Sequence, residues 1–432
     1  MPATGPTGMP ATVPTSVPKS TPTSVPTLPT LPTLPTLPTL PTAARTSAIA
    51  GALAGLLAHL EWWEGLRHEP GTCDLVLGNP QEMPLPGFVS AIRHYSQPLN
   101  KDWFAYKRSE PEAREVVARS LREWRGLPFE PADIALTPGA FGALAVAFRA
   151  LLDPGDEVVY SLPPWFLYEP MLLSADAVPV KVRVRPEDND LDVDAIRSAI
   201  GPRTRAVIVN TPNNPTGRIY PPATLRALAA LLTDASARWG RPIWLISDEP
   251  YSRLVFSDAE FQSPSEFYPY TVISYSYGKV LLTPGERVGW LAISPAIPGR
   301  EQLRQAIEVC QIAAGWLFPS AVLQYAIGDL ERLSIDMADL ERKRDWVVAE
   351  LTAAGYQLRS PEGTFYLWVR SPETDDVAFS RRLAERQVLV LPGTICQAPG
   401  YFRVSLTADN EMIDRALPVF RTAVAEVTGT VG

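Results

Sequence analysis

Five polar side chains with complementary chemistry follow three apolar runs of the sequence. They are an amine, a guanidinium, a carboxylate, a phenol and an amide, namely Lys279, Arg287, Asp248, Tyr251 and Asn214. The first two follow the β-branched run 271–273, the next two end the run 244–247, and the last follows the run 206–209. Such runs are typical of buried strands, and open α/β sheets bind ligands beyond the carboxyl ends of their strands. We therefore expect these five groups to meet at one edge of a sheet.

The order and spacing of these residues resemble those of a known enzyme family. Asn-Pro-Thr-Gly at 214–217, Asp-x-x-Tyr at 248–251 and Ser-x-x-Lys at 276–279, with an arginine eight residues after the lysine, are similar to the class I/II aminotransferases of pyridoxal-phosphate fold type I (aspartate aminotransferase-like). Each motif alone is a weak signal, whereas the ordered set is specific. The resemblance runs from about residue 75 to 420. It implies an α/β fold, with a mainly parallel seven-stranded sheet between helices in a large domain and a smaller α+β domain.

The resemblance assigns roles to the strand-end residues, with pyridoxal 5′-phosphate as the cofactor. Lys279 would hold the cofactor as an imine at rest and, once released, would move the proton between substrate and cofactor. Asp248 would keep the ring nitrogen protonated. Tyr251 and Asn214 would donate hydrogen bonds to the phenolate oxygen of the ring. Asn214 also has a structural interpretation, as a turn former in Asn-Asn-Pro-Thr-Gly.

Five positions match the residues with which the family binds the cofactor phosphate. They are Gly139, Ala140, Phe141, Ser276 and Arg287. The first three lie in a glycine-bearing turn that opens a helical pattern, where free backbone N–H groups and the helix dipole suit a phosphate. Many helices start after a glycine, so this turn is a weak signal on its own. At Gly278 the chain departs from the family's common Ser-x-Ser-Lys form, which replaces one hydroxyl by hydrogen.

Four further positions match cofactor or substrate contacts of the family. Trp165 matches the ring that stacks on the cofactor, and its alternative is a place in the core. Tyr106 matches a tyrosine that reaches the cofactor phosphate of the neighbouring subunit, which implies a homodimer. Gly78 matches a glycine where backbone approaches the substrate carboxylate, although an ordinary turn explains it equally well. Arg403 matches the anchor of the substrate α-carboxylate, and its alternative is a solvated surface residue.

The expected function is amino-group transfer between an α-amino acid and a 2-oxo acid, in amino-acid or specialised metabolism. The same residues serve relatives that cyclise or oxidise amino acids or perform β- or γ-replacement, so these reactions stay open. A non-catalytic cofactor-binding sensor is a third interpretation, but the N-terminal addition carries no basic recognition helix. The substrate side chain stays open too. No arginine stands out as a second, distal cation, and the many tryptophans equally allow aromatic or branched substrates.

The elements that position these residues follow from the alternation of strand-like and helix-like segments over about 133–294. This alternation predicts a doubly wound, mainly parallel domain. We expect a tail over 1–44, an N-terminal helix and part of the small domain over 45–95, and the large cofactor-binding domain over 96–300. An interdomain helix and the C-terminal small domain are expected over 301–432. Long helical patterns cover about 301–330 and 335–354.

The N-terminal residues have an unusual composition. Residues 1–42 hold 12 of the 45 prolines and one charge, with Thr-Leu-Pro repeats that match the three-residue turn of polyproline II. This composition predicts a disordered tail, with docking or tethering as its functional alternative. The apolar stretch 47–60 is shorter than the roughly 20 residues of a membrane span and lies too deep for a usual signal peptide. It predicts an amphipathic helix, a segment that in this family often packs on the partner subunit.

The overall composition argues against several classes of binding partner and site. The net charge of −8 argues against nucleic acid and anionic membranes. The three cysteines are far apart and odd in number, which suggests neither a disulfide framework nor a metal cluster and fits a reducing cytoplasm. All three histidines precede the strand-end motifs, which argues against a histidine triad or a zinc site. We expect a cytoplasmic homodimer whose partners are an amino acid and a 2-oxo acid.

Overall fold

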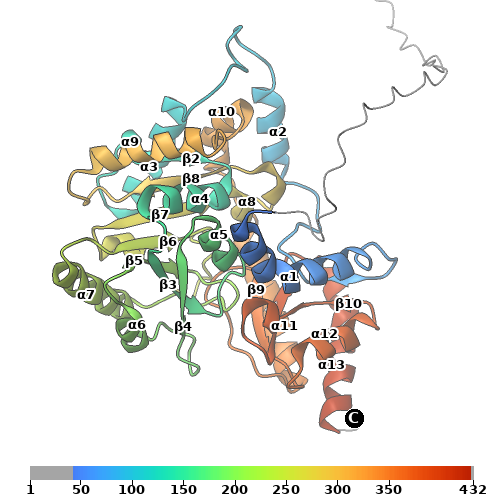
Figure 1. Cartoon of the computed structure of the whole chain (residues 1–432). Coiled ribbons are helices and arrows are strands. Elements are labelled where there is room, and N and C mark those ends of the chain that lie inside the picture. Colours follow the sequence, from blue (N-terminus) through green and yellow to red (C-terminus); the bar gives the residue numbers. More distant parts are fainter. Residues whose placement is uncertain (1–41, 430–432) are drawn as a thin grey trace, which may run out of the picture. The chain divides into compact units, whose positions relative to one another are not determined.

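A seven-stranded sheet lies at the centre of the computed structural model, which describes residues 42–429 (Figure 1). The strands are β2 (Ile134–Thr137), β3 (Glu157–Leu162), β4 (Val178–Arg183), β5 (Thr204–Asn210), β6 (Trp244–Asp248), β7 (Thr271–Ser276) and β8 (Gly289–Ile293). Their order in the sheet is β2-β8-β7-β6-β5-β3-β4. Strand β8 runs antiparallel to both neighbours, and the other pairs are parallel. The predicted mainly parallel seven-stranded sheet is therefore confirmed.

Helices account for most of the remaining structure. The longer ones are α1 (Ala44–Glu64), α2 (Pro86–Tyr95), α3 (Pro111–Arg125), α4 (Gly139–Leu151), α7 (Pro222–Trp239), α9 (Arg300–Ala313), α10 (Ala321–Leu330), α11 (Met337–Ala353) and α13 (Asn410–Thr428). The shorter ones are α5 (Tyr168–Ser174), α6 (Val193–Ala199), α8 (Tyr277–Val280) and α12 (Asp376–Ala384).

Helices cover both faces of the central sheet, and this explains its continuous apolar runs. On β5, Ile208 packs in one cluster with side chains of α4 and α9, whereas Val207 packs in another with side chains of α6 and α7. Figure 1 shows α4 and α9 on one side of the strands and α6 and α7 on the other. Successive side chains of a strand point to opposite faces, so a strand covered on both sides must be apolar throughout.

A smaller group of strands involves the C-terminal residues. Strands β9 (Tyr366–Arg370), β11 (Leu391–Pro392) and β12 (Tyr401–Ser405) form an antiparallel sheet in the order β11-β12-β9. Strand β1 (Cys73–Asp74) pairs in parallel with β10 (Val388–Leu389), which ties the chain near residue 73 to the C-terminal part. The exact domain boundaries stay a prediction.

The helical pattern over 301–330 is not one helix. Helix α9 ends at Ala313 and α10 begins at Ala321. Between them Gly315 has a φ of +112° and Trp316 a φ of +62°, which an α-helix does not allow. The helical region predicted over about 301–330 is therefore two helices, and the sequence did not lead us to expect the break between them, although Gly315 and Pro319 are signals for one.

Helix α1 covers the predicted helical stretch 47–60 but is not amphipathic. It packs against α5, and Arg45 Nη1 lies 2.7 Å from Asp176 Oδ2. Leu56 and Trp63 are its buried residues, while Leu57 is 54% exposed. In the described range, 42–429, we find no helix with the length and apolarity that a bilayer crossing needs. The predicted disordered tail lies outside the described residues, apart from its last few.

Candidate active site

Three neighbouring strands bring their polar ends together. Strand β5 ends at Asn210, β6 at Asp248 and β7 at Ser276. The register pairs Asn210 with Asp248, and Asp248 with Ser274. The chain then continues from β7 into the short helix α8, which carries Lys279. The parallel strand pairing thus places the side chains of Asn210, Asp248 and the two serines at one end of the sheet, where α8 begins and carries Lys279.

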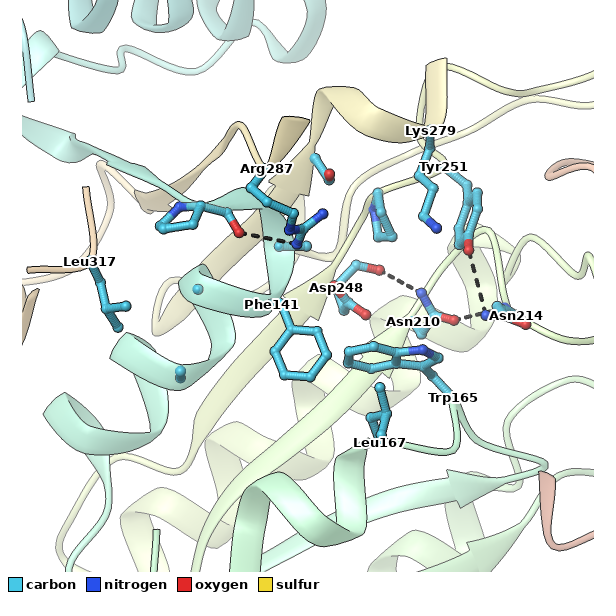
Figure 2. Close-up of a pocket in the computed structure, with 16 residues that line it drawn as sticks. Phe141, Trp165, Leu167, Asn210, Asn214, Asp248, Tyr251, Lys279, Arg287 and Leu317 are labelled. Atoms are coloured by element: carbon cyan, nitrogen blue, oxygen red, sulfur yellow. Dashed lines mark hydrogen bonds between the residues drawn. The ribbon is translucent and has the colours of Figure 1, made fainter. Parts of the chain in front are cut away.

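A cavity of about 530 Å³ opens beyond these strand ends (Figure 2). Its volume lies within the range of small-molecule sites, about 300–1,000 Å³. The residues expected from the sequence that line it are Ala140, Phe141, Trp165, Asn214, Asp248, Tyr251, Ser276, Lys279 and Arg287. The other lining residues are Pro138, Gly142, Ala145, Leu167, Asn210, Pro250 and Leu317. Most of the predicted cofactor site is therefore brought together in one cavity.

The carboxylate of Asp248 is buried at the floor of the cavity and is held by two hydroxyls. Tyr168 Oη donates to its Oδ2 at 2.6 Å, and Ser274 Oγ donates to its Oδ1 at 2.8 Å. Burial raises the pKa of Asp248 to about 6, although the hydrogen bonds from Tyr168 and Ser274 act in the opposite direction and lower it. A positive charge placed against this carboxyl would favour its ionised form. Sequence reasoning gave Tyr168 and Ser274 no role, because no motif marks them.

Lys279 and Tyr251 face each other across one end of the cavity (Figure 2). The Nζ atom of Lys279 lies 5.7 Å from the centroid of the Tyr251 ring. Burial raises the pKa of Tyr251, so its hydroxyl keeps its proton and stays a donor. The amide of Asn214 lies 3.5 Å from Tyr251 Oη and is oriented by Asn210, whose Oδ1 accepts the Asn214 backbone N–H at 2.7 Å. Asn210 was not predicted as a site residue, although it opens the Asn-Thr-Pro-Asn-Asn stretch.

A corner suited to a phosphate lies where α4 begins; we call Pro138, Gly139, Ser276 and Arg287 the phosphate corner. The guanidinium of Arg287 donates to the carbonyl oxygens of Pro284 at 2.6 Å and Pro138 at 3.1 Å, and burial lowers its pKa. Gly139 has a φ of +70°, and a Cβ there would come within 2.7 Å of Arg287 Nη2. A guanidinium beside the N-terminus of a helix is a favourable setting for a dianion.

Trp165 and Phe141 form an aromatic wall of the cavity. Their rings meet edge to face, with centroids 5.2 Å apart, and Trp165 meets Tyr168 in the same way at 5.4 Å. Trp165 is only partly buried, so it is not simply a core residue. Figure 2 shows both rings turned toward the space below Lys279 and Arg287.

Arg403 does not line the cavity but bonds to Asn214, which does. Its side chain is 1% exposed, which rules out the alternative of a solvated surface residue. Its Nη1 donates to Asn214 Oδ1 at 2.7 Å, and its Nη2 donates to the carbonyl oxygen of Val76 at 2.8 Å. The guanidinium carbon lies 3.9 Å from the centroid of the Tyr366 ring. Sequence reasoning missed Tyr366, which lies in the Gly-x-Phe-Tyr stretch after residue 362.

Gly78 and Tyr106, also expected in the site, do not line the cavity. A Cβ at Gly78 would meet Phe365 and Tyr366 at 2.6 Å, so the glycine permits a close approach between the chain and these rings. Tyr106 is 92% exposed, and its ring contacts Trp316 at 5.5 Å. The role implied for Tyr106 concerns the cavity of a second copy of the chain.

The side chains around the cavity fit pyridoxal 5′-phosphate. Lys279 offers an amine to an aldehyde, the phosphate corner offers a cation and a helix N-terminus, and Asp248 offers a carboxylate to a ring nitrogen. Trp165 offers an aromatic face. These donors are arranged around one space, so a single ring with those three substituents could contact all of them.

Comparison with known proteins decides the family. The family model described as aminotransferase class I and II matches residues 73–420. The chain belongs to the class I and II aminotransferases. An aspartate/prephenate aminotransferase of Thermus thermophilus is 33% identical over 358 residues, which cover 80% of this chain and 89% of the relative. An aspartate aminotransferase of Thermotoga maritima is 31% identical over 354 residues, with coverage of 80% and 89%.

Solved structures agree with this assignment. A crystal structure of an amino transferase from Eubacterium rectale has a TM-score of 0.80 and 29% identity, and the match covers 87% of this aminotransferase and 95% of that chain. The aspartate aminotransferase structure from Thermotoga maritima has a TM-score of 0.76 at 28% identity. The resemblance found in the sequence is confirmed, and the protein is a pyridoxal-phosphate-dependent aminotransferase of fold type I.

Proposed function

We propose that this aminotransferase exchanges an amino group between an α-amino acid and a 2-oxo acid in the cavity below Lys279. The proposal is carried by one observation: the Lys279 amine, the buried Asp248 carboxylate and the Arg287 guanidinium line the same cavity. Bound pyridoxal phosphate supplies an aldehyde carbon and an electron-withdrawing ring. The chain's own groups then bind the substrate and move its proton.

In this proposal Lys279 is the base that removes the proton from the substrate Cα and returns one to the product. An amine can do this once it is free of its proton and close to the carbon. Asp248 would hold the ring nitrogen as an ionised carboxylate, because a cation at that nitrogen would offset the burial that otherwise favours the neutral form of Asp248. The hydroxyls of Tyr168 and Ser274 hold this carboxylate in place. Tyr251 and Asn214 would donate hydrogen bonds to the oxygen beside the aldehyde.

We assign the substrate α-carboxylate to Arg403. Its guanidinium has an Nε without a hydrogen-bond partner in the described structure, and its central carbon lies over the Tyr366 ring. A bidentate contact with a carboxylate would use its planar N–H groups, and Asn214, already bonded to Nη1, would border the same carboxylate. The relatives named above are described as aspartate or aspartate/prephenate aminotransferases, so amino acids and 2-oxo acids are the substrate class proposed here.

We further propose that two copies of the chain form the working enzyme. Tyr106 is almost fully exposed and does not contact its own cavity, which fits a residue that reaches the phosphate corner of a second copy. Sedimentation of the purified protein tests this point. A monomer that binds its cofactor fully would contradict it.

The decisive experiment compares Lys279→Ala with Lys181→Ala. Lys181 lies on the edge strand β4 and pairs with Glu169, outside the cavity. We expect Lys279→Ala to lose turnover and the visible absorbance of the covalently held cofactor, and Lys181→Ala to keep both. In the unmodified enzyme an amino acid alone should transfer its amino group to the cofactor once, and a 2-oxo acid should reverse this. Continuous product release without a 2-oxo acid would instead indicate replacement, cyclisation or oxidation.

A further inference from the structure

We infer that the preferred substrate of this cavity carries an apolar or aromatic side chain rather than a second carboxylate. The inference rests on the proposed function, because it concerns the amino acid whose amino group is transferred. It follows from the charges in the cavity lining and from the side chains that form its wall.

The positively charged side chains of the cavity lining already have roles in the proposed function. Among residues 42–429 the lining contains two, Lys279 and Arg287, which in the proposed function would hold the aldehyde and the phosphate of the cofactor. Arg403, bonded to Asn214, is assigned to the α-carboxylate. A second carboxylate taken out of water needs its own cation or several donors, since an unpaired buried charge is strongly unfavourable. The residues that this chain itself contributes to the lining, within 42–429, offer no further cation for it.

The wall that remains for the substrate side chain is apolar. The ring of Phe141 is 41% exposed although it lies in the first turn of α4, and it meets Trp165 edge to face. Leu167 lies beside Trp165 (Figure 2). Ala145, four residues after Phe141 on α4, also lines the cavity. An exposed aromatic ring in a cavity gains free energy when an apolar group covers it. A branched or aromatic side chain would do so, whereas a carboxylate would lose its hydration without a partner.

This inference separates the chain from the relatives it resembles. Those relatives are named for aspartate and prephenate, and both molecules carry a second carboxylate. The substrate expected here has a hydrocarbon side chain of the size of leucine, methionine or phenylalanine.

The test measures how fast single amino acids transfer their amino group to the cofactor of the purified holoenzyme. The decay of the visible absorbance gives a second-order rate constant for phenylalanine, leucine, aspartate and glutamate. A well-fitting apolar pocket discriminates by about 10-fold to 100-fold, so phenylalanine or leucine should exceed aspartate by at least about 10-fold.

Substitutions at Phe141 test whether this aromatic wall causes the substrate preference. Phe141→Lys introduces a cation and should lower the ratio of the phenylalanine to the aspartate rate constant by about 100-fold. The ratio is taken within one protein, so a loss common to all substrates cancels. Phe141→Leu, which keeps the wall apolar, should preserve the preference for leucine over aspartate. Val178→Lys adds the same charge at a 41% exposed position of the edge strand β4 and should leave the ratio unchanged.

Each outcome has a distinct meaning. If aspartate or glutamate reacts faster than phenylalanine and leucine in the unmodified enzyme, the inference is overturned while amino transfer stands. If the ratio does not respond to Phe141→Lys, Phe141 does not set the specificity. If no amino acid changes the absorbance, the proposed function itself fails.

Discussion

Replacing Asp248 by asparagine should stabilise the cofactor-free protein at neutral pH while weakening cofactor binding. The side chain is buried, and its two oxygens accept hydrogen bonds from Tyr168 and Ser274. Asparagine keeps the shape and one acceptor, and a hydroxyl that rotates can accept from its amide. The variant therefore removes the charge of this group with little change in packing.

The magnitude follows from the pKa of Asp248, which burial raises from 3.8 to about 6. Between pH 3.8 and about pH 6 the folded state binds more protons than the unfolded state, so the free energy of unfolding falls as the pH rises. Each pKa unit corresponds to about 1.4 kcal/mol, so ionisation of this carboxyl costs the folded protein about 3 kcal/mol, complete above pH ~6. Asparagine avoids this cost. The variant should gain about 3 kcal/mol between about pH 3 and pH 8, relative to the unmodified protein.

Urea denaturation of both proteins, stripped of cofactor, over this pH range would measure the difference. Asp194→Asn is a suitable control, because that side chain is 97% exposed on α6. A difference between Asp248→Asn and the unmodified protein that does not change with pH would refute the argument. Cofactor titration should also show weaker binding by the variant, since it lacks the carboxylate that we propose to hold the ring nitrogen.

Three further substitutions test other contacts. Arg125→Met leaves the buried carboxylate of Glu249 without the cation 2.7 Å away and should lower the free energy of unfolding by about 3–5 kcal/mol in urea, with partial rescue by adding Glu249→Gln. Gly289→Ala would place a Cβ 2.1 Å from a carbonyl oxygen of the neighbouring strand, so its melting temperature should fall clearly; an unchanged melt would contradict the close packing. Tyr366→Ala removes the ring under Arg403 and should raise KM for the amino acid about 10-fold, whereas Tyr366→Phe should change it little; equal effects would exclude a stacking role.

The sequence predicted the sheet and the polar residues at its strand ends because both follow from local patterns, whereas Ala140, Phe141 and Trp165 were expected from the family resemblance. A strand buried on both faces is a continuous apolar run, and its end is marked by the first polar residues, as at Asn210, Asp248 and Ser276. The position of Arg403 could be expected only from the family resemblance, since it meets Asn214 across 189 residues of chain.

The residues that were missed depend on tertiary packing. Tyr168 looks like any aromatic residue near an apolar segment, and its role appears only when α5 places its hydroxyl beside Asp248. Tyr366 lies within an apolar strand, and only the pairing of β9 with β12 brings it under Arg403. The break near Trp316 was missed because apolar residues continue across it, so the helical pattern alone did not end there.

The first turn of α4 has a consequence for how this enzyme can diverge in evolution. Its main chain borders the phosphate corner, whereas the Phe141 side chain faces the cavity. The backbone N–H groups of this turn are present whichever side chain the codon for position 141 specifies. After a gene duplication, point mutations at position 141 could therefore explore new substrates while the main-chain groups proposed to bind the cofactor phosphate are retained. Gly139, two residues earlier, has no such freedom, because a Cβ there would meet Arg287.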